Sequence, residues 1–280
     1  MVVAMRLDAH LHFWRYDPVR DAWITREMGA IRRDFLPADL APVLGAHRFD
    51  GCVAVEAAPS IAQTQFLLEL AHANPFIRGV VGWVDVLSPD LERTLERLHP
   101  DPRLVGIRYG AQGEPDDFLA RDDVARGVAM LGRFDLAFDI LIYERQLPAA
   151  ITLATRLPEQ TFVLDHIAKP RIADGVIEPW ASRIRELARR PNVSCKVSGM
   201  ITEADWRTWR PAELRPYLDV VFDAFGPNRL VFGSDWPVCL VAGDYARVVS
   251  VVEDYARSLT VAEREALFGG TAARAYGLSH

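Results

Sequence analysis

The sequence predicts an α/β protein folded as one TIM-type (β/α)8 barrel over residues 1–280, with an extra helix at the C-terminal end. Short apolar runs typical of strands buried on both faces alternate with segments of helical pattern, and the alternation reaches eight. Parallel strands joined by right-handed helical crossovers close into barrels of about 250 residues, which suits this length. An open doubly wound sheet is the alternative, but no glycine-rich phosphate-binding pattern follows the first strand. No change of composition marks a second domain.

The expected strands are short and apolar, and several end in a polar residue. The run Gly-Cys-Val-Ala-Val-Glu at 51–56 is apolar up to its final carboxylate, as suits a strand of a buried parallel sheet. We expect the eight strands at residues 6–12, 51–56, 77–85, 104–109, 136–142, 161–166, 193–199 and 230–237.

The helices between these strands have recognisable starts. Pro37 is favoured in a first helical turn, and Ser60 is a favoured N-terminal cap. Residues 13–36, before the first helix, form a long aromatic and charged loop, and long loops in compact domains are often functional. We expect helices at residues 37–47, 60–74, 88–99, 122–132, 147–157, 179–190, 211–225 and 244–257, and a last helical stretch at 261–276.

Composition and charge exclude several classes of function. Half of the residues are hydrophobic and a quarter are charged, and the net charge of −6 gives no basic surface for nucleic acid. No apolar run is long enough to span a bilayer, so no membrane partner is expected. Cys52, Cys195 and Cys239 lie far apart, and residues 1–6 are too short for a signal peptide. We therefore expect free thiols and a cytoplasmic protein.

The first strand ends in two histidines two residues apart. Because side chains alternate along a strand, Asp8, His10 and His12 are expected on one face and the intervening apolar residues on the other. Two imidazoles on one face can hold a metal ion or grip a polar substrate. Taken alone, they are also consistent with partly buried polar residues of an N-terminal strand.

Polar and aromatic residues also fall at the ends of the other strands, where barrels of this kind carry their active sites. Each has a structural alternative; Glu56, for example, can form an ion pair with Arg108 or Lys196. Their convergence on one rim indicates a functional site. The residues concerned are His10, His12, Glu56, Trp83, Asp85, Arg108, His166, Lys196, Asp235 and Trp236.

Several motifs resemble the amidohydrolase superfamily. The segment Asp8-x-His10-x-His12 is similar to its opening motif, and residues 163–170, 230–237 and 267–278 resemble later signatures of its metal-dependent-hydrolase-like branch, amidohydrolase 2. Within that branch, which includes pyrone and sugar lactonases, the chain looks most like the L-fuconolactonases and L-rhamnonolactonases. The segments that carry this finer resemblance are 12–14, 17–18, 106–108 and 196–199.

The resemblance implies hydrolysis of a sugar aldonolactone to its acid, with L-fuconolactone, 1,5 or 1,4, as the favoured substrate after a sugar dehydrogenase. It implies that Asp235 deprotonates water. Histidines can donate to the carbonyl oxygen, and such preorganised donors contribute about 3–4 kcal/mol each. The expected catalytic residues are Asp235, His166, His10 and His12. The expected substrate-binding residues are Arg108, Glu56, Trp14, Trp83, Lys196 and Trp236.

Metal is expected to be optional. Superfamily members that bind metal often use two first-strand histidines, a sixth-strand histidine and an eighth-strand aspartate, which correspond here to His10, His12, His166 and Asp235. The fifth strand offers Asp139 and no histidine, so a binuclear site is not expected. One zinc ion with an open water position fits this donor set. Because lactones are activated esters, a metal-free route is also consistent with the sequence, and the resemblance to pyrone lactonases suggests it.

Two other functions stay open from the sequence. One is decarboxylation, or hydrolysis of another cyclic ester, both within the same branch; decarboxylation would depend on a firmly held metal. The other is a non-catalytic barrel that binds a sugar. For the favoured lactonase function, the expected partner is a small-molecule lactone. The sequence leaves the oligomeric state open.

Overall fold

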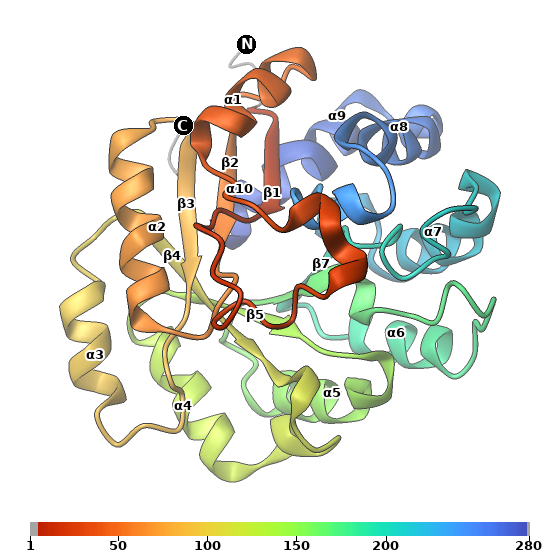
Figure 1. Cartoon of the computed structure of the whole chain (residues 1–280). Helices are drawn as coiled ribbons and strands as arrows, with labels where there is room; N and C mark the ends of the chain where they lie inside the picture. The colour runs from red at the N-terminus through yellow and green to blue at the C-terminus, as the bar shows by residue number, and fades with distance from the viewer. Residues whose placement is uncertain (1–4, 279–280) are drawn as a thin grey trace.

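The computed structural model describes residues 5–278 and has the predicted architecture. Eight parallel strands follow one another around a barrel in sequence order, and the helices form a ring outside them (Figure 1). A parallel bridge between Leu11 and Trp236 joins the two ends of the sheet, and the amide of His12 donates to the Trp236 carbonyl oxygen at 2.7 Å. The predicted (β/α)8 barrel is thereby confirmed.

The strands are shorter than expected at several of their C-terminal ends. The sixth and eighth strands end before His166 and Asp235, because the backbone there turns into the left-handed region. The strands are β1 (Leu7–Leu11), β2 (Gly51–Val55), β3 (Ile77–Gly82), β4 (Leu104–Gly110), β5 (Ala137–Leu141), β6 (Phe162–Leu164), β7 (Val193–Val197) and β8 (Leu230–Phe232).

The helices lie close to their predicted positions. The Ser60 hydroxyl caps α2 by accepting a hydrogen bond from the Gln63 amide, and Asp244 caps α8 in the same way. The helices are α1 (Pro37–Ala46), α2 (Ile61–Ala73), α3 (Leu91–Leu98), α4 (Asp122–Gly132), α5 (Leu147–Arg156), α6 (Trp180–Ala188), α7 (Pro211–Phe225), α8 (Tyr245–Tyr255), α9 (Val261–Glu265) and α10 (Thr271–Ala275). A π-helical turn, Ala266–Gly270, divides the predicted last helix into α9 and α10.

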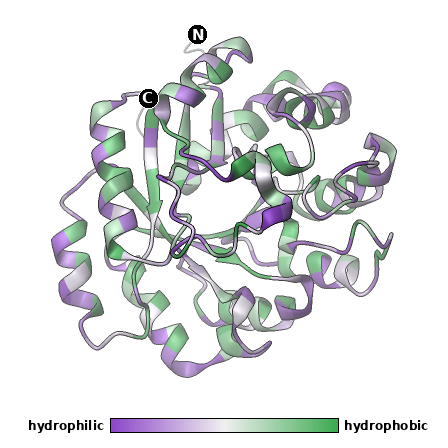
Figure 2. Cartoon of the chain, viewed as in Figure 1, coloured by the Kyte–Doolittle hydropathy of each residue, from purple (hydrophilic) through white to green (hydrophobic). Residues whose placement is uncertain are grey.

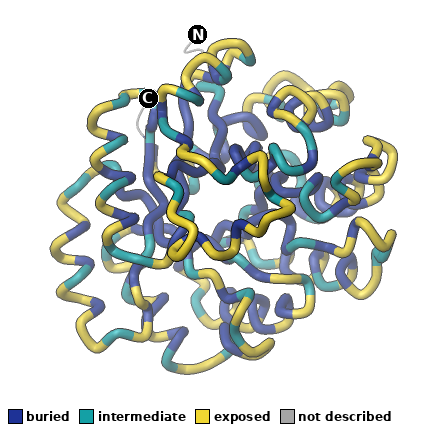
Figure 3. The backbone as a smooth tube through the Cα atoms, viewed as in Figure 1, coloured by how far each residue is buried: buried dark blue, intermediate teal, exposed yellow. Residues whose placement is uncertain are grey.

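Hydrophobic residues occupy the strands and the inner faces of the helices, while hydrophilic residues lie outside (Figure 2). The strands are buried almost throughout, and exposure is concentrated on the outer helices and loops (Figure 3). One apolar cluster joins residues from strands all around the sheet with Ala272 and Tyr276, which can meet only inside the barrel. The C-terminal segment therefore closes the barrel near the strand starts.

No helix within residues 5–278 is long and apolar enough to cross a membrane.

One prediction about β1 is wrong: Asp8 does not share a face with His10. Asp8 accepts hydrogen bonds from the Ser234 amide at 2.9 Å and from the Tyr245 hydroxyl of α8 at 3.0 Å, whereas His10 contacts Lys196 of β7. The pairing of β1 with β2 shifts register between Asp8 and Leu11. Such an irregularity interrupts the alternation of faces, so it turns His10 toward the residues inside the barrel.

The three cysteines are buried free thiols, as predicted. Burial raises the pKa of Cys52 and of Cys195, which makes both thiols unreactive. We expect Cys52→Ala and Cys195→Ala each to lower the free energy of unfolding by about 1 kcal/mol through lost packing. Turnover should stay within twofold of wild type. Urea unfolding together with kcat tests this, and a large loss of kcat with unchanged stability would contradict it.

Candidate active site

A cavity of about 680 Å³ opens at the C-terminal ends of the strands, where the sequence predicts a site. The segment after β1 crosses in front of these strand ends, as the red chain of Figure 1 shows. The cavity is lined by His12, Trp23, Glu56, Ala57, Pro59, Trp83, Arg108, Tyr109, Gly110, Gln112, Glu114, Leu141, Tyr143, His166, Lys169, Asp235 and Val238.

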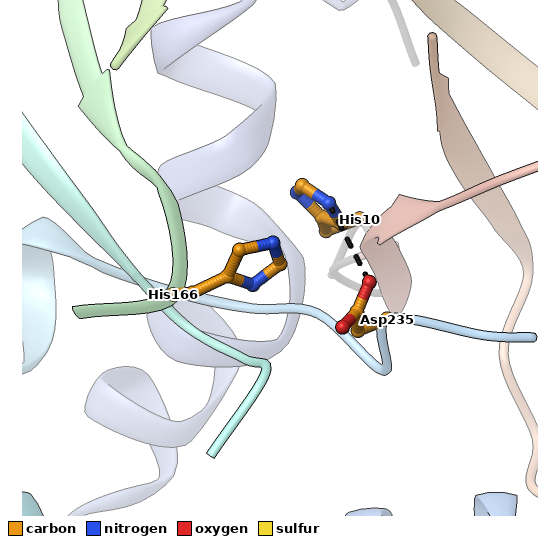
Figure 4. A group of neighbouring side chains, drawn as sticks. All are labelled: His10, His166 and Asp235. Atoms are coloured by element: carbon orange, nitrogen blue, oxygen red, sulfur yellow. Dashed lines mark ion pairs between the residues drawn. The ribbon is translucent and has the colours of Figure 1, made fainter. Parts of the chain in front are cut away.

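Asp235 lies among three imidazoles at the base of this cavity. Its Oδ1 is 3.3 Å from His12 Nε2 and 3.9 Å from His10 Nε2. Figure 4 shows His10 of β1, His166 beyond β6 and Asp235 beyond β8 converging. One potential ligand atom from each of the three lies within 4.8 Å of the others. The four predicted catalytic residues are therefore neighbours, although their segments span most of the chain.

One hydrogen bond of His12 fixes the role of each of its ring nitrogens. His12 Nδ1 lies 2.9 Å from the Val55 carbonyl oxygen, so it carries a proton and donates it. In the neutral ring, His12 Nε2 then presents a lone pair to the Asp235 carboxylate. Two acceptors at this distance require a proton or a cation between them, so this pair is suited to take up either.

Electrostatics keep Asp235 ionised. Burial alone would raise the pKa of Asp235, but its interactions with the surrounding imidazoles, those of His166 and His12 above all, hold it below its usual range. Burial lowers the pKa of His166 to about 4 despite the neighbouring carboxylates. Burial and the Lys196 charge also hold the pKa of His10 well below its usual range. At neutral pH the site combines a charged carboxylate with uncharged His10 and His166.

The backbone at two site residues is left-handed. Residues 166–169 have φ between 48° and 61°, and Asp235 has φ of 57°. Non-glycine residues rarely adopt this conformation, and it concentrates at functional sites where the surrounding structure enforces it. Here it ends β6 and β8 early and turns His166 and Asp235 into the cavity.

Gly199, at the end of the predicted Lys-Val-Ser-Gly segment, makes room for His166. Its φ is +62°, and a Cβ there would lie 2.5 Å from His166 Nδ1, the atom that is 2.9 Å from the Ser198 hydroxyl. We expect Gly199→Ala to displace the imidazole and lower kcat about 10²-fold, the cost of a misplacement near 1 Å. Gly175→Ala is the matched control, since its φ is +65° with nothing within 4 Å of the added Cβ. Equal kcat values for the two variants would contradict the prediction.

Lys196 is not a cavity residue, which corrects its predicted contact with substrate. Its ammonium is fully buried, 2.5 Å from Asp139 Oδ2, 2.9 Å from Asp165 Oδ1 and 3.0 Å from His10 Nδ1. Lys196 projects from β7 into the barrel, and the shifted register of β1 brings His10 to it, so the ammonium lies beneath the histidines. It therefore acts on His10 and the two carboxylates and does not reach a substrate.

Arg108 and Glu56 do line the cavity, and they form the ion pair that the sequence offered as their structural alternative. Arg108 Nε donates to Glu56 Oε1 at 2.8 Å, and its Nη1 lies 3.3 Å from Asp165 Oδ2. Neighbouring carboxylates raise the pKa of Arg108 against the effect of burial. The guanidinium is consequently a permanent positive charge with a fixed orientation at the cavity wall.

Of the three tryptophans predicted to bind substrate, only Trp83 lines the cavity. Trp14 is buried and its Nε1 donates to the Arg33 carbonyl oxygen at 2.9 Å, while Trp236 packs on Phe35. Trp14 is buried with its N–H group hydrogen-bonded, and Trp236 is buried against Phe35. Both therefore stabilise the loop behind the site. The aromatic wall comes instead from residues that the sequence did not single out, which are Trp23, Tyr109 and Tyr143.

The buried cluster has a donor set and a charge that suit a divalent cation. Four carboxylates, Glu56, Asp139, Asp165 and Asp235, face only two cations, Arg108 and Lys196, in the described cluster. His10 Nε2 is buried without a hydrogen-bond partner. Imidazole nitrogens and one carboxylate are zinc ligands. The residues therefore fit one such ion between His10, His166 and Asp235, and the fourth predicted ligand, His12, lies beside Asp235.

Comparison with known proteins identifies the family. A sequence model described as amidohydrolase matches residues 7–278. The chain belongs to the amidohydrolase family. This amidohydrolase is 46% identical over 287 residues to an L-fucono-1,5-lactonase of Burkholderia multivorans, covering 98% of this chain and 97% of that protein. It is 42% identical to an L-fucono-1,5-lactonase of Burkholderia ambifaria over 84% of this chain and 81% of that one.

A solved structure shares the fold of this amidohydrolase in full. It is an amidohydrolase from Burkholderia multivorans with bound zinc, with a TM-score of 0.94 and 45% identity, covering 99% of this chain and 100% of that one. The predicted superfamily is thus confirmed. A relative binds zinc, and this chain has a cluster of residues that could hold a metal ion.

Proposed function

We propose that this protein hydrolyses sugar lactones, with L-fucono-1,5-lactone as the favoured substrate. The predicted class, a carboxylic-ester hydrolase acting on lactones, is confirmed by relatives of that name that are 42% and 46% identical. The observation that carries the assignment in this chain is the ionised Asp235 among His10, His12 and His166 at the base of a cavity. This is the arrangement that water-mediated ester hydrolysis requires.

We assign the proton-accepting role to Asp235. It takes a proton from a water molecule that attacks the lactone carbonyl carbon, while the uncharged His166 and the fixed charge of Arg108 stabilise the developing oxyanion. The ring C–O bond then breaks, and the proton passes from Asp235 to the leaving alkoxide. The products are a free hydroxyl group and a carboxylic acid, which releases its proton to solvent to become the carboxylate, so no other reactant is needed.

We assign substrate binding to the aromatic wall and to Glu56. Trp83, Trp23 and Tyr143 offer flat surfaces to the apolar face of a sugar ring. Glu56 and Gln112 offer acceptors for its hydroxyl groups. A dehydrogenase that oxidises the anomeric carbon of L-fucose would supply such a lactone, which places the reaction in L-fucose breakdown. A cytoplasmic location stays a prediction.

The metal is proposed to be optional. When bound by His10, His12, His166 and Asp235, zinc would supply Lewis-acid activation of water or carbonyl. Arg108 already provides a positive charge at the cavity wall, and Asp235 is ionised without a metal. The residues of this chain can therefore activate water and stabilise the oxyanion by themselves.

We expect exhaustive chelation to leave most of the lactonase activity. The measurement is kcat before and after dialysis against a chelator, with zinc content determined by elemental analysis. Re-addition of zinc serves as the control. Complete loss of activity that zinc restores would make the metal obligatory and contradict the prediction.

A panel of aldonolactones assayed with a pH indicator tests the function itself. We expect the highest kcat/KM for L-fucono-1,5-lactone and lower values for epimers and for lactones without the methyl group. Failure to hydrolyse any lactone would overturn the proposal. Decarboxylation of an aromatic acid that depends on tightly held metal would support the alternative chemistry, and tight binding without turnover would indicate a sugar-binding barrel.

A further inference from the structure

A tyrosine of the C-terminal segment reaches the buried charges beneath the active site. Tyr276 follows α10 and lies inside the barrel, in one apolar cluster with Ala9 of β1 and Val231 of β8. Its hydroxyl donates to the carboxylate of Asp139 on β5, with oxygen–oxygen distances of 2.8 and 3.0 Å. Tyr276 does not line the cavity, so it cannot touch a substrate there.

A continuous line of contacts connects this hydroxyl with His10. Asp139 Oδ2 accepts from Lys196 Nζ at 2.5 Å, and Lys196 Nζ donates to His10 Nδ1 at 3.0 Å. The three residues and Tyr276 are all buried. On the other side of the ring, His10 Nε2 faces Asp235 at 3.9 Å.

We propose that Tyr276 is a positioning residue for the lactonase site, acting on His10 through Asp139 and Lys196. An ammonium group has three donors, and three acceptors surround it here: Asp139, Asp165 and His10 Nδ1. Its position depends on how strongly each acceptor is held in place. Tyr276 anchors Asp139, so Lys196 stays within hydrogen-bond distance of His10 and holds the ring with Nε2 toward Asp235.

The chemical consequence concerns turnover and not binding. Lys196 Nζ lies 3.0 Å and Asp165 Oδ1 lies 3.3 Å from His10 Nδ1, so the position of the ammonium sets how the ring is held while its Nε2 faces Asp235. Without the Tyr276 hydroxyl, Asp139 can move toward the ammonium, and Lys196 can draw away from His10. The cavity lining is untouched by this shift, so affinity for the lactone should be unaffected.

Tyr276→Phe tests the proposal because it removes the hydroxyl and keeps the ring that fills the barrel. We expect kcat for the best lactone to fall about 10- to 100-fold, the usual cost of losing an outer partner of a site histidine, with KM unchanged. Tyr217→Phe is the matched control, since Tyr217 is also buried and its hydroxyl donates to the Val176 carbonyl oxygen at 3.1 Å, in contact with α6 and not with the site. It should leave kcat and KM as in wild type.

A second measurement does not depend on activity. The ring nitrogens of His10, assigned by NMR with the help of His10→Gln, should change their chemical shifts in Tyr276→Phe and not in Tyr217→Phe. Asp139→Asn interrupts the same line one residue nearer to His10 and should lower kcat at least as much as Tyr276→Phe.

The outcomes separate this inference from the proposed function on which it rests. Wild-type turnover of the lactone panel decides the function, whereas the ratio of variant to wild type and the His10 signals decide the role of Tyr276. A folded Tyr276→Phe with wild-type kcat and unchanged His10 shifts would overturn the inference. An equal loss of kcat in Tyr217→Phe would also overturn it, because the effect would then be one of general stability.

Discussion

Asp235→Asn should lower lactonase kcat about 10³-fold or more, within the range that one general base contributes. The amide is nearly the same size and can still contact His12, so the fold should be retained. It cannot accept the proton of the attacking water, however, and it removes the negative charge that faces three imidazoles. The measurement is kcat on the best lactone of the panel, with circular dichroism and thermal melting to establish folding.

Glu114→Gln is the matched control for Asp235→Asn. It makes the same change of carboxylate to amide in the cavity lining, beside Tyr109 and away from the histidines. We expect at most a change in KM, with kcat within a few-fold of wild type. Turnover of Asp235→Asn close to wild type would remove Asp235 from the role of base and shift attention to the histidines.

Lys196→Met should lower the free energy of unfolding by about 3–5 kcal/mol, because it leaves buried carboxylates without their cation. Among the described residues, Asp139 would keep only the Tyr276 hydroxyl, and Asp165 would keep Arg108 and the His10 ring. Burial raises the pKa of Asp139 to about 6 even with Lys196 opposing it, so this carboxylate is costly to leave charged. The measurement is the midpoint of urea unfolding at neutral pH.

Lys169→Met gives the comparison for Lys196→Met. Lys169 also pairs with a carboxylate, Glu203 at 3.2 Å, but both side chains are about one-fifth exposed, at 21% each. Such partly exposed pairs contribute about 1 kcal/mol or less. Similar destabilisation in the two variants would show that the buried cluster does not depend on the Lys196 charge.

The sequence was sufficient for the fold and for the chemistry gathered at one end of it. Apolar runs and helix starts recur locally, so eight alternating elements could be counted, and a parallel barrel then brings all strand ends to one rim. This is why Glu56, Arg108, His166 and Asp235 were predicted together and do line one cavity. The aromatic residues were harder, because Trp14 and Trp23 stand in the same loop and only its path decides which one faces the cavity.

The direction of individual side chains was decided by the tertiary structure. The shifted register of β1 separates Asp8 from His10, and left-handed backbone turns His166 and Asp235 inward; strict alternation of faces predicts neither. Lys196 was predicted to contact substrate because its partner Asp139 is 57 positions away, and the sequence pattern does not reveal such a long-range pair. Tyr276 meets Asp139 across 137 positions. By itself the sequence determined the barrel, the family and the residue types at the rim, because these follow from local pattern. The tertiary structure decided which groups line the cavity and which buried groups position them. This depends on strand register, backbone dihedral angles and long-range contacts, which exist only once the barrel is closed.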